Sequence, residues 1–113
     1  MDVMNKVKIE ELGAQIGINN LPPLFEIFTS ELAQYQNQIK ASQADSVTLQ
    51  LGEICHALKS SAASFGADAL CHHAKEIDVL YKHRKDLSQG DYIERTLELL
   101  VKTHQVYTQF ELN

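Results

Sequence analysis

The spacing of apolar residues constrains this chain more than any other feature, because apolar side chains recur at steps of three and four residues nearly from end to end. That period places them along one stripe of an α-helix, whereas a half-buried strand would need strict alternation. With only 2 Pro and 5 Gly, the chain also lacks the turn residues that a protein of many short strands requires. The pattern therefore predicts an all-α protein.

Five helical segments follow from these stripes and from the residues that start and end helices. Four of them are long and joined by short loops, which predicts an antiparallel up-down four-helix bundle with a short extra N-terminal helix. The length of 113 residues fits one domain, 1–113. The expected segments are Val7 to Gln15, Leu21 to about Lys40, a third capped by Asp45 or Ser46 and ended by Gly66, a fourth capped by Asp68, and a fifth capped by Asp91.

The charge balance and the missing motifs exclude several function classes. The chain has 15 acidic and 10 basic residues and a formal net charge of −5, which disfavours nucleic acid and acidic membrane surfaces as partners. No apolar run approaches the roughly 20 residues of a membrane span, and no secretory signal is visible. We therefore expect a cytoplasmic protein with reduced thiols. We also expect it to be a monomer. Neither GxGxxG nor GxxxxGK[ST] occurs, so we expect no ATP-dependent chemistry of its own.

The third segment has an exposed face of unusual composition. Its apolar stripe centres near Leu58, and at about 100° per residue His56 falls about 150° away, which points the imidazole outward. Small side chains let another backbone approach closely, so we expect this face to present His56 to a partner protein. The small residues expected on the face, with Lys59 along one edge, are Gly52, Ser60, Ala63 and Ala67.

The twelve residues from His56 to Ala67, HALKSSAASFGA, resemble the signature of histidine phosphotransfer (HPt) domains. That signature reads His-x-Leu-Lys-Gly-Ser-Ala, followed after a few residues by an apolar residue and Gly-Ala. The expected helices agree with the family over essentially the whole chain. The longer stretch HALKSSAASFGADALC is most similar to the small single-domain members of quorum-sensing relays. Ser60 departs from the wider family, which usually has Gly there, but serine is also small.

The resemblance implies a role for each matched residue and a set of partners. His56 would carry a phosphoryl group on a ring nitrogen, Lys59 would offset phosphate charge, and Ser60 would keep the approach open. The phosphoryl group would come from an aspartate of a hybrid sensor-kinase receiver domain and pass to an aspartate of a response regulator. The protein would be no ATP-dependent kinase and need no cofactor of its own, with Mg²⁺ held by the partner receiver domain.

Two other functions stay open at this point. A helical adaptor could bind a partner's amphipathic helix without covalent chemistry, although a groove for that purpose would need exposed Leu, Phe or Met. A metal-binding bundle could use Cys55-His56 or Cys71-His72-His73. Adjacent residues on a helix diverge by about 100°, however, so neither cluster is preformed and we expect no metal site.

The fourth segment offers candidates to flank His56. Lys75, Asp78 and Lys82 are expected to point outward there, but the rotation of one helix against another cannot be read from the sequence. The polar run Lys82-His83-Arg84-Lys85 is interpreted as a solvated helix end, with the border of the docking surface as the alternative.

Overall fold

The computed structural model describes residues 1–111 of the chain. The described residues form five α-helices and one short 3-10 helix, with no strand among them. This confirms the all-α prediction. The elements are α1 (Lys6–Ile16), η1 (Ile18–Asn20), α2 (Leu21–Ala41), α3 (Val47–Ser64), α4 (Asp68–Lys82) and α5 (Tyr92–Gln109).

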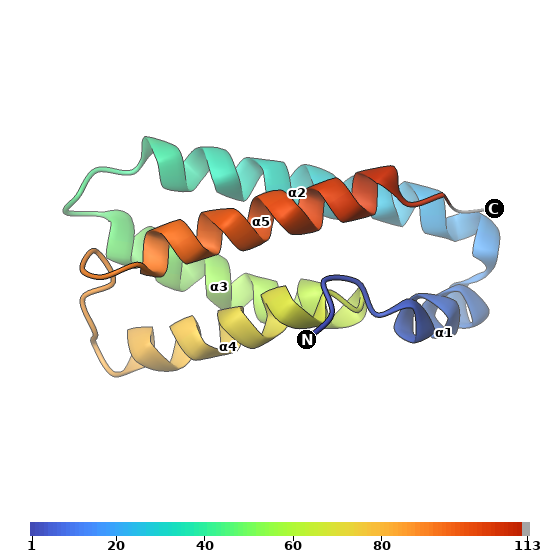
Figure 1. Cartoon of the computed structure of the whole chain (residues 1–113), viewed down its shortest axis with the longest axis horizontal. Helices are drawn as coiled ribbons and strands as arrows, with labels where there is room; N and C mark the ends of the chain where they lie inside the picture. The colour runs from blue at the N-terminus through green and yellow to red at the C-terminus, as the bar shows by residue number, and fades with distance from the viewer. Residues whose placement is uncertain (112–113) are drawn as a thin grey trace.

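Helices α2 to α5 form the antiparallel four-helix bundle that the sequence predicts. Consecutive helices run in opposite directions, α3 packs chiefly on α4, and α2 packs chiefly on α5 (Figure 1). The loops α2–α3 and α4–α5 lie at one end of the bundle, at the left of Figure 1. The molecule as a whole, α1 included, is elongated, with extents of 44 × 24 × 19 Å. The site described below lies on the α3–α4 pair.

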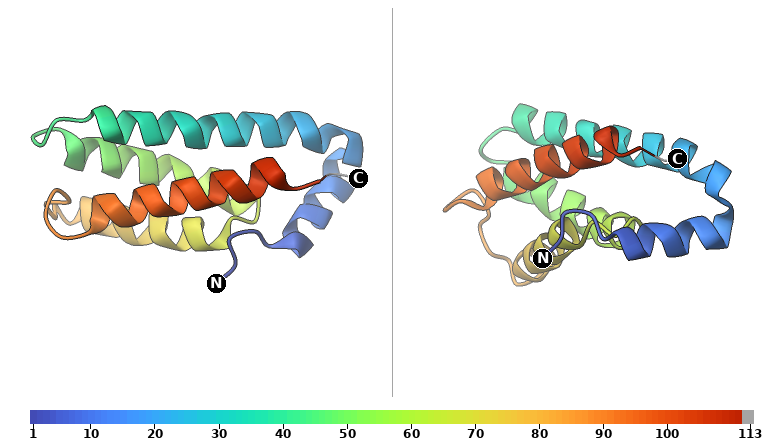
Figure 2. Two further views of the ribbon diagram at one scale, coloured as in Figure 1. Left: turned by 45° about the horizontal axis from the view of Figure 1, so that its top comes forward. Right: turned by 45° about the vertical axis from the view of Figure 1, so that its right-hand side comes forward.

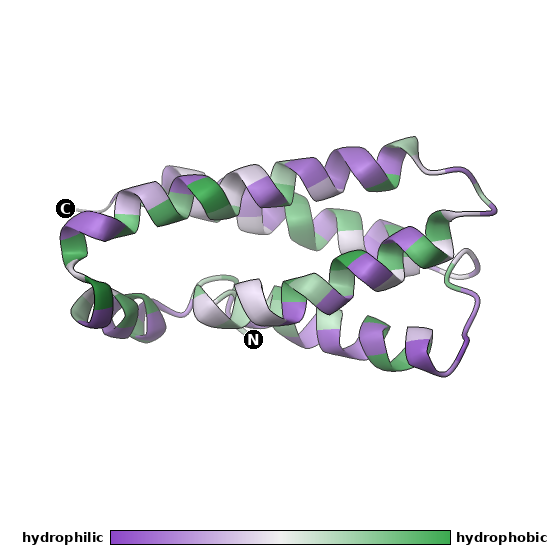
Figure 3. Cartoon of the chain, turned by 180° about the vertical axis from the view of Figure 1, so that it is seen from behind, coloured by the Kyte–Doolittle hydropathy of each residue, from purple (hydrophilic) through white to green (hydrophobic). Residues whose placement is uncertain are grey.

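The core is built mainly from the apolar stripes of the four long helices, with Ile9 of α1 and Leu87 of the α4–α5 loop packed against them. In Figure 3 each long helix changes between hydrophobic and hydrophilic residues along its length, as an amphipathic helix should. Two threonines of α5, Thr96 and Thr103, are also fully buried and were not expected in the core. The largest apolar side chains below 2% exposure are Phe28, Leu32, Leu51, Leu58, Leu70, Ile77, Leu87 and Leu100.

Helix α1 closes one end of the bundle and holds the turn between α3 and α4 (Figure 2). The Asn5 backbone N–H donates to the Gly66 carbonyl at 2.7 Å, just before the α4 N-terminus. The Asn5 side chain and Lys8 Nζ donate to the two carboxylate oxygens of Asp68, at 3.0 and 2.9 Å. The N-terminal segment therefore fixes the point at which the chain passes from α3 to α4.

The helix starts are close to their predicted positions, but the predicted side-chain caps do not form. Ser46 and Asp91 occupy the N-cap positions of α3 and α5 without a capping hydrogen bond. Asp68 is the first residue of α4 and not its cap, because Ala67 occupies the cap position. The Asp68 carboxylate is engaged by residues of the N-terminal segment, a tertiary contact that spacing along the chain cannot reveal.

None of the helices within residues 1–111 has the length and apolar character that a membrane span requires.

Candidate functional site

His56 lies in the middle of α3 and faces outward, as the helical wheel predicts. Its side chain is 64% exposed, while the neighbouring Cys55 and Leu58 are fully buried. The imidazole is therefore accessible to a partner protein, yet its helix is anchored in the core on both sides of it.

A carboxylate from α4 holds the His56 ring. Nδ1 of His56 lies 3.1 Å from Oδ1 of Asp78, whose side chain is only 4% exposed. The second carboxylate oxygen accepts hydrogen bonds from Lys59 Nζ at 2.7 Å and from Lys82 Nζ at 2.8 Å. We call these four residues the Asp78 cluster. It brings together groups from α3 and α4 that lie up to 26 positions apart (82 − 56).

The orientation expected for Asp78 was wrong in one respect. Asp78 does flank His56, but it is buried and does not point outward. A carboxylate can be buried at low cost only when cations and hydrogen-bond donors surround it, and three such groups do so here. A signal was present in the sequence: Asp78 lies four residues after buried Ala74 and three before Tyr81, so it interrupts an apolar stripe.

Electrostatics keep Asp78 ionised. Burial raises the pKa of this carboxyl, but hydrogen bonds from Lys59, Lys82 and His56 more than offset burial and hold the pKa well below its usual range. The same contact raises the pKa of Lys82. At neutral pH the cluster thus contains one carboxylate and two ammonium groups next to the imidazole.

The ionised carboxylate determines which nitrogen of His56 is free. Because Asp78 has no proton to donate, Nδ1 of the imidazole must carry the proton in their hydrogen bond. In the neutral ring the lone pair is then on Nε2, the nitrogen that Asp78 does not engage. A neutral imidazole with a free, solvent-accessible Nε2 is a nucleophile at neutral pH.

The small-residue face is narrower than predicted. Ser60 and Ala63 are exposed, and Lys59 is partly exposed. Gly52 and Ala67 are buried, so the prediction that they lie on the exposed face was wrong.

Packing against α4 and the turn before it explains why Gly52 and Ala67 are buried. The Tyr81 ring covers Gly52 so closely that a Cβ atom at that position would collide with it. Ala67 lies beyond the end of α3, where the wheel of that helix no longer applies, and it is the buried last residue of the turn before α4. Gly52 therefore lets Tyr81 approach α3 near the Asp78 cluster.

The remaining candidates take no part in the cluster. Lys75 is exposed on α4, and no hydrogen bond or ion pair joins it to another described residue. Cys55 and Cys71 are buried, and burial raises the pKa of the Cys55 thiol to about 12, so that it stays protonated. Across the part of the chain that the structure describes, no three His, Cys, Asp or Glu side chains are grouped to hold a metal ion.

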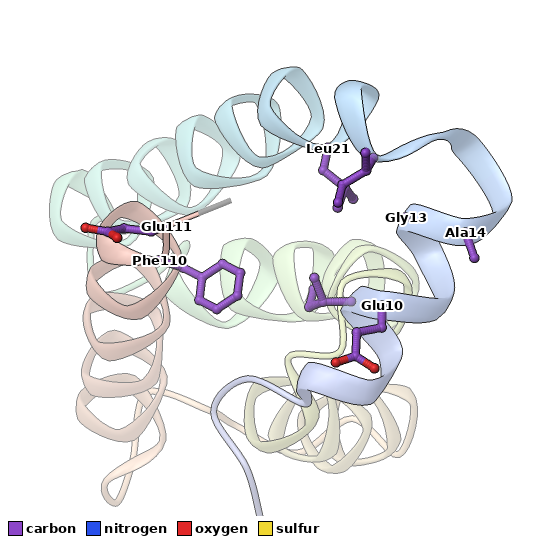
Figure 4. Close-up of a pocket in the computed structure, with 8 residues that line it drawn as sticks. Glu10, Gly13, Ala14, Leu21, Phe110 and Glu111 are labelled. Atoms are coloured by element: carbon purple, nitrogen blue, oxygen red, sulfur yellow. The ribbon is translucent and has the colours of Figure 1, made fainter. Parts of the chain in front are cut away.

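A cavity of about 560 Å³ between α1, the start of α2 and the end of α5 lies outside the Asp78 cluster (Figure 4). Its walls are mainly apolar, with Ile9, Leu21 and Phe110 among them, and it contains no histidine or lysine. Its ionisable side chains are the carboxylates of Glu10 and Glu111, and no exposed imidazole lies in it, so we place the candidate site at His56.

Known proteins resemble this chain over nearly its whole length. The family described as Hpt domain matches residues 23–105. The "Phosphorelay protein LuxU" of Vibrio vulnificus (strain YJ016) is 42% identical over 113 residues, which cover 100% of this chain and 98% of that protein. The protein of the same name from Vibrio harveyi is 46% identical over 106 residues, or 94% and 93% of the two chains. No solved structure matches the chain. The matches confirm the resemblance that the residues from His56 to Ala67 carry.

Proposed function

The chain belongs to the Hpt domain family, and on that premise we propose that it carries a phosphoryl group on His56 from one partner protein to another. It is similar over nearly its full length to proteins named phosphorelay protein LuxU, and it acts as an intermediate of a quorum-sensing phosphorelay. The observation that supports His56 as the carrier is its contact with Asp78, which leaves Nε2 of an exposed imidazole free.

The first step transfers one phosphoryl group from a partner's aspartate to His56. The Nε2 lone pair of His56 attacks the phosphorus of an aspartyl phosphate on a hybrid sensor-kinase receiver domain. The N–P bond forms, the bond between phosphorus and the aspartate oxygen breaks, and the aspartate leaves as a carboxylate with the electron pair. The Nδ1 proton stays in its hydrogen bond with Asp78, which stabilises positive charge that develops on the ring.

The second step reverses these bonds on another partner. An aspartate of a response regulator attacks the phosphorus, and His56 leaves with the electron pair on Nε2. Lys59 and Lys82 balance charge in both steps, because each bonds to the same Asp78 carboxylate that holds the His56 ring. Their contributions are modest, because solvent screens charges that lie near the surface.

The partners follow from this chemistry and from the family. We propose receiver domains of hybrid sensor kinases upstream and a LuxO-like response regulator downstream, with a monomer of this chain shuttling between them in the cytoplasm. The chain is a phosphotransfer intermediate, and we propose that it has no ATP-dependent kinase activity. We further propose that Mg²⁺ is held by the receiver domain during each transfer.

The small residues next to His56 favour this function over a helical adaptor. Ser60 and Ala63 leave room for a partner's backbone, but they supply no apolar anchors around the imidazole. A partner can therefore approach His56 closely without a large hydrophobic contact, as a transient transfer complex requires.

The test is incubation with a hybrid sensor-kinase receiver domain that acetyl phosphate has phosphorylated, followed by mass spectrometry of this chain. We expect one added phosphate, on His56, that is lost in mild acid and survives alkali. Phosphate on another histidine would contradict the site assignment, and no transferred phosphate would contradict the relay.

A further inference from the structure

The C-terminal end of α4 contains a backbone conformation that its sequence does not favour. Arg84 has φ 61°, and no other non-glycine residue in the described chain has a positive φ. The amide of Lys85 bonds to the Leu80 carbonyl and that of Arg84 to the Tyr81 carbonyl, both at 3.0 Å. This arrangement ends a helix with one left-handed residue, usually glycine, and α3 ends that way at Gly66 with φ 70°. Arginine at this position is strained, so its side chain should offer a compensating advantage.

Helix stability does not account for this arginine. Cations near a helix C-terminus are favourable, but Lys82 and Lys85 already provide them there. In the described part of the chain, the side chains of Arg84 and Lys85 form no hydrogen bond or ion pair, and both residues are exposed. Arg84 thus stabilises no contact within the protein, and a role toward a partner remains.

A surface hollow of about 560 Å³ lies beside Arg84, between the end of α4 and the start of α3. We call it the α4-end hollow. Three of its lining residues are cations in a chain whose net charge is −5. The one carboxylate of the hollow, on Asp86, is held by Thr48 and Ser88. The lining residues are Thr48, Tyr81, Lys82, Arg84, Lys85 and Asp86.

The hollow is continuous with the site of phosphoryl transfer. Lys82 belongs both to the hollow and to the Asp78 cluster, and Tyr81 covers Gly52 between them. Thr48 precedes His56 by eight residues on α3, a rise of about 12 Å. A specific interface of about 800 Å² per partner has a radius of roughly 16 Å. A protein centred on His56 would therefore cover the hollow.

We propose that the α4-end hollow binds an acidic segment of the receiver domain that docks on His56, with Arg84 and Lys85 as its main contacts. This proposal rests on the proposed function. Charge complementarity of this kind acts mainly on the rate of encounter and on the choice of partner. The strained Arg84 then exchanges stability of the free protein for faster docking.

The test compares two double variants that lose the same charge. Arg84→Gly/Lys85→Gln changes the hollow, and Lys6→Gln/Lys102→Gln removes two exposed lysines from α1 and α5. Each variant receives phosphate from the phosphorylated receiver domain at about 0.05 M and about 0.5 M salt, and separately from phosphoramidate. Two single variants separate the effect of backbone strain from the effect of charge. Arg84→Gly removes both the strain and the charge, and Arg84→Lys keeps both.

We expect the hollow variant to accept phosphate from the receiver domain about tenfold more slowly at low salt, with the difference shrinking at high salt. Labelling by phosphoramidate should stay at the wild-type rate, because a small donor needs no docking surface. Arg84→Gly should raise the melting temperature by about 4 °C while slowing transfer. Arg84→Lys should keep most of the transfer rate, and Lys6→Gln/Lys102→Gln should keep all of it.

Three results would overturn the proposal: wild-type transfer by the hollow variant, equal slowing in the lysine control, or equal slowing with phosphoramidate. Equilibrium binding of the unphosphorylated receiver domain separates this proposal from the relay itself. If the hollow variant binds more weakly but the wild type accepts no phosphate, the docking role of the hollow is supported and the relay is contradicted. If the wild type is labelled normally and the hollow variant binds and accepts phosphate as the wild type does, the relay is supported and the docking role of the hollow is contradicted.

Discussion

Nδ1 of His56, on the exposed face of α3, lies 3.1 Å from Oδ1 of the buried Asp78 on α4. This contact orients the imidazole and assigns its proton, because the ionised carboxylate can only accept. It also joins the reactive residue to two lysines that share the same carboxylate.

His56→Gln should abolish phosphate labelling by both a receiver domain and phosphoramidate. The side chain is exposed, so the free energy of unfolding should change by less than about 1 kcal/mol. Urea denaturation and mass spectrometry check the two effects. His72→Gln is the matched control on α4, because the His72 side chain is 58% exposed, close to the 64% of His56, and this variant should label normally. Remaining label in the His56 variant would show that another residue carries the phosphate.

Asp78→Asn should slow labelling about tenfold, because a neutral amide replaces a charge-assisted hydrogen-bond acceptor worth about 1.5 kcal/mol more. Asp78→Ala should slow it further. The ¹⁵N chemical shifts of the His56 ring report its tautomer. The wild type should show Nδ1 protonated and Nε2 unprotonated, and Asp78→Ala should show a mixture of the two tautomers. An unchanged tautomer in Asp78→Ala would mean that Asp78 does not position the ring.

Lys59→Ala should reduce the transfer rate or the lifetime of the phosphorylated protein tenfold or less, consistent with roughly 1 kcal/mol from a partly exposed charge. Lys82 still contacts Asp78 in this variant and retains part of the charge balance. Stopped-flow transfer and the decay of the phosphorylated form measure both quantities. Complete loss of transfer would give Lys59 a role beyond charge balance.

Ser60→Arg should fold normally, since arginine is a good helix former at an exposed position, but it should block transfer from a receiver domain. Phosphoramidate should still label His56 in this variant. Ser60→Gly should keep transfer and lose about 0.5–1 kcal/mol of stability. Transfer by Ser60→Arg at the wild-type rate would show that the partner does not dock over this turn.

His73 should make the fold sensitive to mild acid. It is buried, and burial together with the charge of Arg95 lowers its pKa, although Glu76 and Asp91 act in the opposite sense. Its Nε2 bonds to Thr96 at 2.6 Å, while Nδ1 is buried without a partner among the described residues. The unfolded chain therefore binds a proton at a higher pH than the folded one.

The consequence is a loss of stability as the pH falls below about 6.5, through the window between the unfolded and the folded pKa of His73. Urea midpoints at pH values above and below that window measure it. His73→Gln should remove most of this dependence, and His72→Gln, on the exposed side of α4, should not. An equal pH dependence in wild type and His73→Gln would assign the effect to other groups.

Local patterns in the sequence were sufficient for the helices, the bundle and the outward position of His56. Apolar spacing determines which face of a helix is buried, and Gly66 ends α3 with a positive φ as predicted. The short N-terminal helix was also predicted, and it forms as α1. Its apolar Val7 is nevertheless 61% exposed and lies outside the core. The family signature is local in the same sense, since it lies within one helix and the turn after it.

Contacts between helices were decided only by the tertiary structure. Whether Asp78 faces solvent or His56 depends on the rotation of α4 against α3, and Gly52 is buried only because Tyr81 packs over it. Asp68 bonds to Asn5 and Lys8 across 63 and 60 positions, so spacing along the chain could not show that its carboxylate is engaged there and does not cap α4. The sequence by itself thus determined the periodicity, the fold class and the reactive histidine. The tertiary structure decided the groups that orient this histidine, because burial and hydrogen bonding between helices depend on distances that no local pattern encodes.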